Sequence, residues 1–227
     1  MGITGTTRLC FILGRPIGHT LSPTMHNAAF AALALPYVYL PWAVPPEGLG
    51  AAAAAFRAME NFAGANVTVP HKEAIRVHLD ALSPEAEGTA EITVANRSPE
   101  RAEALVGTLS ARFRRCQFLA LPLQAPGVVE AVKSADVLIN ATSVGLAPGE
   151  VLPLDLGGLR PTTLVCDLIY RPLETAFLEA ARGKGCRVLN GLGMLLHQGA
   201  AAFRLFTGMD PPLDAMRAAL ARGLAGP

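Results

Sequence analysis

The sequence has few cysteines, and none of them is spaced like a metal ligand or a redox pair. The chain of 227 residues contains four, at positions 10, 116, 166 and 186. Disulfide frameworks and structural zinc sites need several closely spaced ligands. The five histidines offer no zinc-like arrangement either. We therefore expect reduced, buried thiols, as in a cytoplasmic protein, and no bound metal.

The chain also has no long apolar run and little net charge. No segment approaches the roughly 18 consecutive apolar residues of a membrane span, and no charged-then-apolar signal sequence is present. The formal net charge is only +1, which argues against nucleic acid as the main partner. We expect a cytoplasmic monomer or homodimer that binds small molecules, and neither nucleic acid nor a membrane.

Apolar side chains, by contrast, are abundant. Hydrophobic residues make up 51% of the chain and charged residues 16%, a composition that excludes a disordered protein. Short apolar segments alternate with helical patterns along the whole chain, and glycine or proline marks the connections. The predicted strands are 8–13, 37–40, 64–70, 91–95, 118–121, 137–140, 163–167 and 187–189. The predicted helices are 22–33, 49–59, 72–79, 99–111, 125–133 and 173–182.

This alternation predicts an α/β fold with parallel sheets, arranged as two α/β domains. The boundary falls near residues 85–88, between the two series of strands. We expect a first domain of residues 1–87, with residues 200–227 returning to it, and a second domain of residues 88–199. Ser22 and Pro23 start the first helix, with serine as N-cap and proline at the first helical position.

Four stretches of polar and glycine residues follow one another in an order that resembles the shikimate dehydrogenases. Each stretch alone is weak, but the joint pattern spans the whole chain and is specific. The resemblance implies an N-terminal substrate-binding domain and a Rossmann-like NADP-binding domain. It implies the reversible, NADPH-dependent reduction of 3-dehydroshikimate to shikimate, a step of aromatic amino acid biosynthesis. The stretches are 18–23 with His26 and Asn27, 66–72, 140–143 with 167–172, and 191–195 with Gln198 and Gly199.

The residue types suit shikimate, which is a small polyhydroxy carboxylate. By resemblance Thr20 and Ser22 bind the carboxylate, because hydroxyl donors beside a helix N-terminus favour an anion. The family usually has serine where this chain has Thr20, and threonine keeps the hydroxyl. Asn66 and Thr68 resemble the ligands of the ring hydroxyls, at the carboxyl end of a predicted strand where open α/β sheets place ligands.

Lys72 resembles the catalytic lysine of the family. In that role it transfers the proton as the alcohol and the ketone of the substrate interconvert. Tyr170 and Gln198 would complete the substrate pocket. Each of these residues also has a plain structural explanation, since an exposed lysine in a first turn is usually a surface charge. The joint pattern favours the functional interpretation.

The cofactor residues come from the second half of the chain. Asn96, Arg97 and Ser98 follow a predicted strand and resemble the family's NADP-selecting loop, and Arg101 could assist. A guanidinium there can pair with the ribose 2′-phosphate of NADP. The resemblance also assigns Thr142, Leu168, Gly191 and Gly193 to the cofactor, the last three on the nicotinamide side.

The resemblance breaks between Asp80 and Glu91. Family members have a substrate-binding asparagine, the catalytic aspartate and a Rossmann strand with its glycine-rich phosphate loop there. Residues 81–90 cannot hold them, because a βαβ unit needs about 30 residues. The pair Gly191 and Gly193 does not replace the loop, since Leu196 stands at the sixth position. We expect the Rossmann sheet to lack its central strand and Lys72 to lack its carboxylate partner.

Two origins explain this gap, and three functions follow from it. Either the gene product has an internal deletion, or the sequence omits residues of a longer protein. A complete protein would be the dehydrogenase or a relative acting on quinate. A truly deleted chain would be a non-catalytic shikimate-binding remnant or sensor.

The intact mass of the purified protein separates the two origins. At 23.7 kDa the deletion is real, and we expect no dehydrogenase activity and at most weak shikimate binding. A mass several kilodaltons higher predicts an ordinary active enzyme. Turnover by a chain of 23.7 kDa would contradict this expectation.

Overall fold

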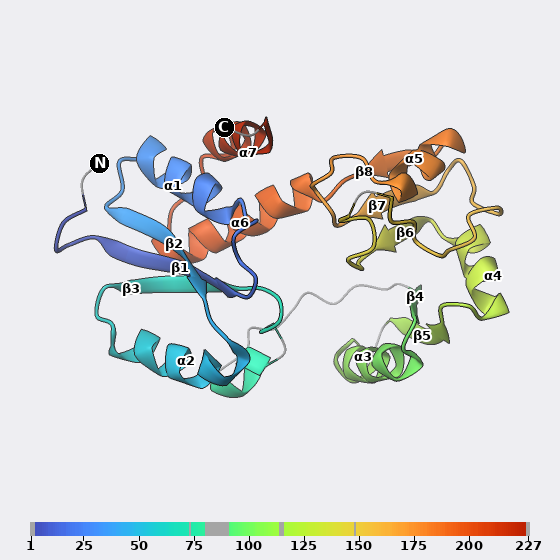
Figure 1. Ribbon diagram of the computed structural model, residues 1–227, viewed down its shortest axis with the longest axis horizontal. Coiled ribbons are helices and arrows are strands. Elements are labelled where there is room, and N and C mark those ends of the chain that lie inside the picture. The colour runs from blue at the N-terminus through green and yellow to red at the C-terminus, as the bar shows by residue number, and fades with distance from the viewer. Residues whose placement is uncertain (1–2, 73, 80–90, 114–115, 148, 226–227) are drawn as a thin grey trace. The chain divides into compact units, whose positions relative to one another are not determined.

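The computed structural model describes residues 3–72, 74–79, 91–113, 116–147 and 149–225. The chain divides into two compact units, Met1–Leu82 with Gly193–Pro227, and Ser83–Leu192 (Figure 1). The predicted boundary near residues 85–88 lies outside the described residues. The long helix α6, Leu192–Thr207, belongs almost entirely to the first unit, whereas the predicted domain limit at residue 199 falls inside it.

The first unit is a three-layer α/β structure. Its parallel sheet has the order β2-β1-β3, so the first strand of the chain lies in the centre. Helices α1 and α6 cover one face of the sheet and α2 covers the other (Figure 1). The elements are β1 Arg8–Gly14, α1 Ser22–Ala32, β2 Tyr37–Ala43, η1 Pro46–Gly48, α2 Leu49–Ala58, β3 Phe62–Val67, η2 Ala74–His78 and, after α6, α7 Leu213–Ala225.

Alternate side chains of β1 supply the cores on the two faces of the sheet. Phe11 and Leu13 point toward α2, where the Phe11 ring lies 5.4 Å from the ring of Phe56. On the opposite face α6 approaches α1 so closely that a Cβ atom at Gly199 would overlap the side chain of Met25. Helix α7 packs against the outside of α1. These layers hold β1 rigidly and fix where its carboxyl end emerges.

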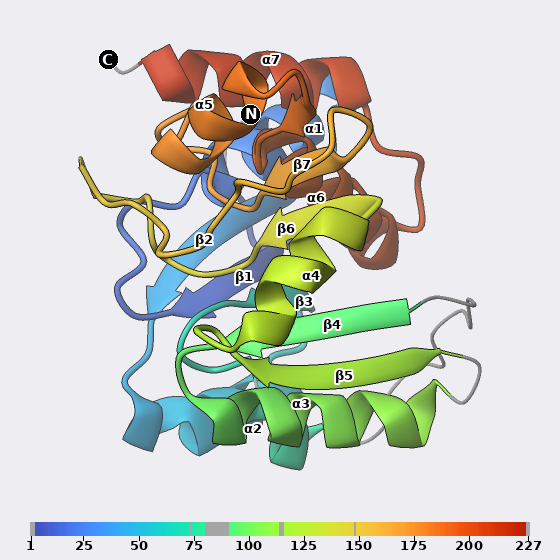
Figure 2. The same ribbon diagram turned by 90° about the vertical axis from the view of Figure 1, so that its right-hand side faces the viewer.

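The second unit contains two short parallel sheets. Strands β4 and β5 form one sheet, and β6, β7 and β8 form the other in that order. Helix α3 packs on β4 and β5, as Figure 2 shows, while α5 packs on β7 and β8. The elements are β4 Glu91–Asn96, α3 Pro99–Arg112, β5 Gln117–Pro122, α4 Pro126–Ser134, β6 Val137–Asn140, β7 Leu164–Asp167, α5 Ala176–Gly183 and β8 Arg187–Leu189.

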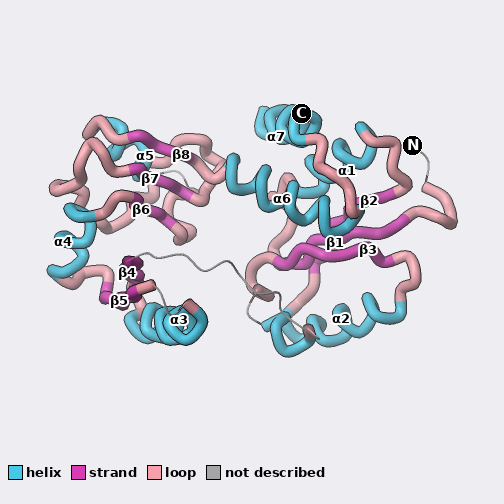
Figure 3. The backbone as a smooth tube through the Cα atoms, turned by 180° about the vertical axis from the view of Figure 1, so that it is seen from behind, coloured by secondary structure: helices cyan, strands magenta, loops and turns pink. Residues whose placement is uncertain are grey.

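No strand joins these two sheets among the described residues of the second unit (Figure 3). Apolar side chains on both sheets remain accessible: Ile92 is 39% exposed, Val137 50% and Ile139 55%. A complete sheet would bury such residues on both faces. The break lies between β4 and β6, where the sequence predicts that the central strand is absent.

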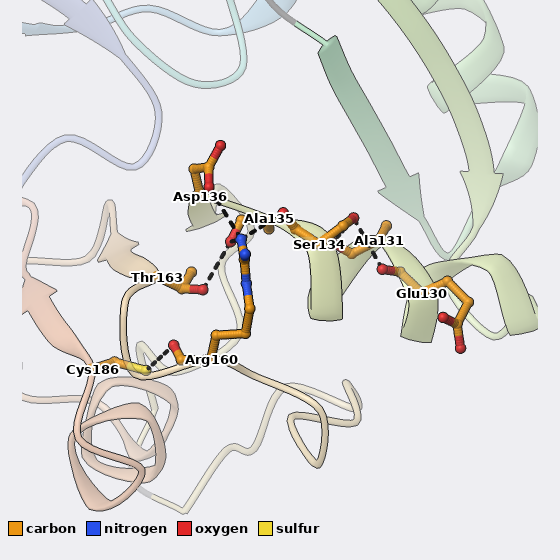
Figure 4. Close-up of polar contacts among 8 residues, drawn as sticks. All are labelled: Glu130, Ala131, Ser134, Ala135, Asp136, Arg160, Thr163 and Cys186. Carbon is orange, nitrogen blue, oxygen red and sulfur yellow. Dashed lines mark hydrogen bonds and ion pairs between the residues drawn. The ribbon is translucent and has the colours of Figure 1, made fainter.

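Arg160 connects helix α4 to the loop that leads into β7. Its guanidinium donates hydrogen bonds to the carbonyl oxygens of Ser134 and Ala135, at 2.7 and 3.0 Å, at the end of the helix (Figure 4). Thr163 donates to the same Ala135 oxygen at 2.8 Å. Because the last carbonyls of a helix have no partner within it, these bonds stabilise both the helix end and its position.

Three sequence predictions differ from the structure. Ser22 is the first helical residue and not the N-cap, since Leu21 holds that position without a side-chain bond. The predicted helix 72–79 is the short 3-10 helix η2. The predicted strand 64–70 is Phe62–Val67 in the structure, so it starts two residues earlier and ends three residues earlier than predicted.

A fourth difference is helix α5, which begins later than predicted; the remaining predicted elements agree with the structure within three residues, whereas α6 and α7 are not among the predicted helices. Helix α5 starts at Ala176 because Thr175 is its N-cap, with the Thr175 hydroxyl accepting a hydrogen bond from Leu178 N. The prediction at residue 173 missed this cap.

His26 is a buried titratable group in the first unit. It is fully buried, its ring nitrogens have no partner among the described residues, and burial lowers its pKa to about 4. The unfolded chain therefore binds a proton at higher pH than the native one, so stability is present above pH 6.5 and is lost as pH falls toward 4. We expect His26 to lower the free energy of unfolding by about 3 kcal/mol as the pH falls from 6.5 to 4.

Urea unfolding of the wild type and of His26→Phe, measured between pH 7 and 4, tests this expectation. The phenylalanine keeps a ring in the core but cannot titrate, so its free energy of unfolding should fall less steeply with pH. Parallel pH profiles for the two proteins would contradict it.

Candidate active site

Two hydroxyl groups lie beside the start of helix α1. Thr20 precedes the helix and Ser22 is its first residue, and their oxygen atoms are 3.2 Å apart. The backbone N–H of Ser22 donates to the Thr20 oxygen at 3.3 Å. The free N–H groups of the first helical turn and the helix dipole favour an anion at this place. The structure thus brings together the two residues that the family resemblance assigns to the carboxylate of the substrate.

Asn66 and Thr68 lie at the carboxyl end of β3. Asn66 is opposite Ile12 of the central strand, and the Thr68 N–H donates to the Leu13 carbonyl at 2.8 Å. A Cβ atom at Gly14 would overlap the Thr68 methyl group, so glycine is required for this close approach. Ser22 follows β1 and Asn66 lies near the end of β3, so both belong to the edge where parallel α/β sheets bind ligands.

Lys72 follows β3 after a short turn and its side chain is exposed. It makes no hydrogen bond or ion pair with the residues that the structure describes. The preceding His71 is buried, and its Nε2 lies 2.7 Å from the carbonyl oxygen of Val44. This contact anchors the turn, so the lysine extends from a fixed backbone. His71 therefore has a structural role in this turn.

Gln198 lies on α6, the helix that covers the same sheet face as α1. Its side-chain amide donates to the Leu195 carbonyl at 3.1 Å, within the helix. Gly193 lies in the first turn of α6, and nothing lies within 4 Å of where its Cβ atom would be. The side chain of Gln198 is exposed. It is therefore accessible to a ligand, and its assignment to substrate stays a prediction.

Leu168 and Gly191 meet in the second unit. A Cβ atom at Gly191 would overlap the Leu168 carbonyl, and the Gly191 N–H donates to Ile169 O at 2.9 Å. Only glycine fits at this contact, so the motif glycine has a packing role whether or not a cofactor binds. Tyr170, the residue directly after Ile169, is half-buried. Tyr170 belongs to the second unit, so its role beside the first-unit residues stays a prediction.

A buried carboxylate that the sequence did not single out organises the loops after β6 and β7. Asp167 accepts hydrogen bonds from Thr175 Oγ1 at 2.7 Å, Ile169 N at 3.0 Å and Asn140 Nδ2 at 3.2 Å. Asn140 in turn accepts from the N–H and the hydroxyl of Thr142. The sequence could have indicated this site, because Asp167 and Asn140 each end a predicted strand within the stretches that resemble the family.

The Thr142 hydroxyl is consequently committed to the loop itself. It donates to Asn140 Oδ1 at 2.8 Å and accepts from the Val144 N–H at 3.1 Å. One lone pair of the oxygen remains for a ligand. Thr142 is exposed, so a cofactor can reach its hydroxyl. Its observed role is to shape the turn.

The loop after β4 presents basic side chains. Asn96 Oδ1 accepts from the Ser98 N–H at 3.0 Å, which folds the turn, and Arg97 is exposed on it. Arg97 has no hydrogen-bond or ion-pair partner in the described parts of the chain. Arg101 lies in the first turn of α3. Two guanidinium groups and a helix N-terminus lie close together in the sequence here, a combination that favours a phosphate group.

The pyrophosphate of a dinucleotide finds no matching loop among the described residues. A Rossmann site needs a strand, a glycine-rich turn and a helix in succession, with the turn at the switch point of the sheet. In the described part of the second unit the switch point falls between β4 and β6, where the two sheets are unpaired. The basic residues therefore fit one end of NADP, and the rest of its cradle is not matched.

The described residues contain no group of three or more histidine, cysteine, aspartate or glutamate side chains that could hold a metal. They also contain no helix long and apolar enough to cross a membrane. Polar and cationic groups instead follow parallel strands in both units. Together with the parallel sheets of the two units, this arrangement places the chain in the class of two-unit α/β proteins with a Rossmann-like unit.

Sequence comparison identifies the family. A family model described as the shikimate dehydrogenase substrate-binding domain matches residues 12–95, and one described as the shikimate 5′-dehydrogenase C-terminal domain matches residues 191–221. A shikimate dehydrogenase (NADP+) of Moorella thermoacetica is 37% identical, covering 99% of this chain and 98% of the relative. That of Geobacter metallireducens is 36% identical, covering 96% and 97%. The chain belongs to the shikimate dehydrogenase family.

Solved structures agree with this assignment. A shikimate dehydrogenase in complex with NADP+ matches with a TM-score of 0.84 at 29% identity, covering 98% of each chain. The Listeria monocytogenes enzyme, solved with shikimate and NAD, matches with a TM-score of 0.84 at 30% identity, covering 96% of this chain and 98% of that one. The predicted α/β fold class and family are confirmed.

The comparisons also bear on the gap. The two alignments run over 279 and 290 positions, although this chain has 227 residues. At least 52 positions of each relative (279 against 227) are therefore missing from this chain. Each alignment nevertheless extends over almost the whole length of the relative, from near its beginning to near its end. The missing positions accordingly lie inside the chain, as the sequence predicts.

Asp167→Ala should destabilise the second unit strongly. The substitution leaves three buried donors without an acceptor, so we expect a loss of about 3 kcal/mol or more in the free energy of unfolding. The matched control is Asp136→Ala, whose side chain is 96% exposed and pairs with Arg160 at 3.1 Å. That change should cost no more than about 1 kcal/mol. Urea unfolding measures both, and equal effects would refute the structural role of Asp167.

Proposed function

We propose that the protein catalyses the reaction of its family, the reversible reduction of 3-dehydroshikimate to shikimate with NADPH. The reaction belongs to the route to chorismate and the aromatic amino acids. The curated relatives are named as NADP-dependent shikimate dehydrogenases. We further propose that the protein works in the cytoplasm, as a monomer or homodimer, with small molecules as its partners.

One structural observation carries this proposal. The residues that the family resemblance assigns to substrate in the first unit come from two segments far apart in the sequence, and both lie at the carboxyl end of one parallel sheet or at a helix start beside it. Thr20 and Ser22 contact each other, while Asn66 and Thr68 end the neighbouring strand. Hydroxyl and amide groups of this kind suit a carboxylate and ring hydroxyls.

Each side chain then has a defined task. The hydroxyls of Thr20 and Ser22, with the first turn of α1, hold the carboxylate. Asn66 and Thr68 bind ring hydroxyls and so orient the carbon that reacts. Lys72 donates a proton to the carbonyl oxygen during reduction and takes it back during oxidation, which is general acid–base catalysis. NADPH, when bound, supplies the hydride, and Arg97 and Arg101 would hold its 2′-phosphate.

The remaining predicted residues belong to the same proposal. Tyr170 and Gln198 would contact the substrate. The cofactor would contact Asn96, Ser98, Thr142, Leu168, Gly191 and Gly193. A preference for quinate over shikimate would arise near Thr20 and Tyr170. The quinate dehydrogenase of Corynebacterium glutamicum is 23% identical to this chain, which supports only the shared fold.

A specific observation favours a second function, that of a non-catalytic shikimate-binding protein. The first unit keeps its substrate residues on an intact sheet. The second unit has two unpaired sheets in its described part, and the chain is at least 52 positions shorter than its relative (279 against 227). Such a chain would bind shikimate through the first unit and would lack the pyrophosphate cradle.

Lys72→Ala tests the catalytic assignment. Loss of a general acid–base group should lower kcat by roughly 100- to 10,000-fold, whereas shikimate affinity should change only a few-fold. Steady-state oxidation of shikimate with NADP+ measures kcat. The matched control is Lys184→Ala, an exposed lysine in the second unit, which should keep wild-type turnover. Unchanged turnover in Lys72→Ala would eliminate the proposed role.

Calorimetric titrations with shikimate and with NADP+ separate the two functions. Binding of both ligands together with turnover supports the dehydrogenase. Shikimate binding without NADP+ binding or turnover supports the second function. A chain that binds neither ligand would exclude both.

A further inference from the structure

Tyr39 reaches across the sheet of the first unit to Asn66. It lies on the edge strand β2 opposite Cys10 of the central strand, while Asn66 lies on β3 opposite Ile12. Cys10 and Ile12 are two residues apart on β1, so Tyr39 and Asn66 project from the same face of the sheet. This is the face that α1 and α6 cover (Figure 1). Two strands on either side of β1 are therefore linked above it.

The link is a short hydrogen bond with a defined direction. The Tyr39 hydroxyl donates to Asn66 Oδ1 at 2.7 Å. The phenol is 1% exposed, and burial raises its pKa, which keeps the donating proton on the oxygen. Because Oδ1 is engaged, the Nδ2 end of the amide points away from the phenol. An amide held in this way offers N–H donors to a ligand.

Tyr39 is itself held on both its backbone and its ring. The Asn27 side chain donates to the Tyr39 carbonyl at 2.9 Å and accepts from the Tyr39 N–H at 2.8 Å. The His26 ring stacks on the phenol with a centroid separation of 4.3 Å and an angle of 4°. Phe206 of α6 lies 6.3 Å from the same ring. The phenol thus has little freedom to turn away from Asn66.

We propose that Tyr39 is a positioning residue that orients the Asn66 amide toward shikimate, and that His26 and Asn27 hold Tyr39 in place for this task. The inference rests on the proposed function, which assigns Asn66 to the substrate. Its consequence for specificity is that the ligand atom facing Asn66 must be a hydrogen-bond acceptor, a condition that a hydroxyl oxygen meets. Tyr39 does not touch the ligand in this arrangement.

The test is shikimate affinity, measured by NMR titration of the full chain for wild type, Tyr39→Phe, Asn66→Ala and the double variant. Tyr39→Phe keeps the stacked ring and removes only the hydroxyl. We expect it to weaken affinity about 5- to 10-fold, as for the loss of one oriented hydrogen bond. In the Asn66→Ala background the same change should alter affinity less than about 2-fold, because the amide to be oriented is gone.

Tyr37→Phe is the matched control. Tyr37 lies two residues earlier on β2, and its ring packs 5.2 Å from the Phe30 ring. It should leave shikimate affinity unchanged. Thermal unfolding of all variants separates a loss of affinity from a loss of fold, and the side-chain amide signal of Asn66 should broaden in Tyr39→Phe and stay sharp in Tyr37→Phe.

The outcomes distinguish this inference from the function on which it rests. If Asn66→Ala weakens shikimate binding and Tyr39→Phe does not, Tyr39 has no positioning role. Equal effects of Tyr39→Phe in both backgrounds would mean a general structural effect and would also overturn the inference. If wild type does not bind shikimate, or Asn66→Ala binds it as wild type does, the assignment of Asn66 fails first and the inference fails with it.

Discussion

The parallel pairing of β1 with strands on both sides is the interaction on which the first unit depends. Backbone hydrogen bonds along β1 fix β2 and β3 in register, and helices on both faces bury alternate side chains of the central strand. All three strands run in one direction, so their carboxyl ends meet at one edge. Polar side chains that follow different strands are therefore gathered without any contact between their own segments. The hydroxyls at the start of α1 and the amide on β3 reach the same edge for this reason.

In its described residues, the second unit shows what happens when the central position of such a sheet is not filled. Its strands still pair in parallel, and each short sheet keeps a helix against it. The loops beyond β6 and β7 remain ordered by the buried carboxylate of Asp167, which needs no neighbouring strand. Apolar side chains of β4 and β6, however, stay partly exposed. A phosphate loop needs the central strand, whereas a basic turn after β4 does not. This difference explains why one end of the cofactor site is recognisable and the other is not.

Much of this arrangement was predictable from the sequence, for identifiable reasons. Short apolar runs bounded by glycine and proline located the strands, since a buried parallel strand has few other patterns. The family motifs located Lys72 and Asn66 on the chain. The errors lie at element ends. Ser22 looked like an N-cap but is the first helical residue, and the helix predicted after Pro70 is the short 3-10 helix η2. Such choices depend on partners distant in sequence.

The sequence by itself determined the alternation of strands and helices, the family, and the absence of a segment between Asp80 and Glu91. Each of these depends on local pattern or on spacing along the chain. Only the tertiary structure decided that Tyr39 bonds to Asn66, that the buried ring nitrogens of His26 have no hydrogen-bond partner among the described residues, and that Asp167 holds two loops. These contacts join residues far apart in the sequence, and no local pattern specifies them. Hydrogen bonds in a buried site form only where packing removes water and fixes both partners.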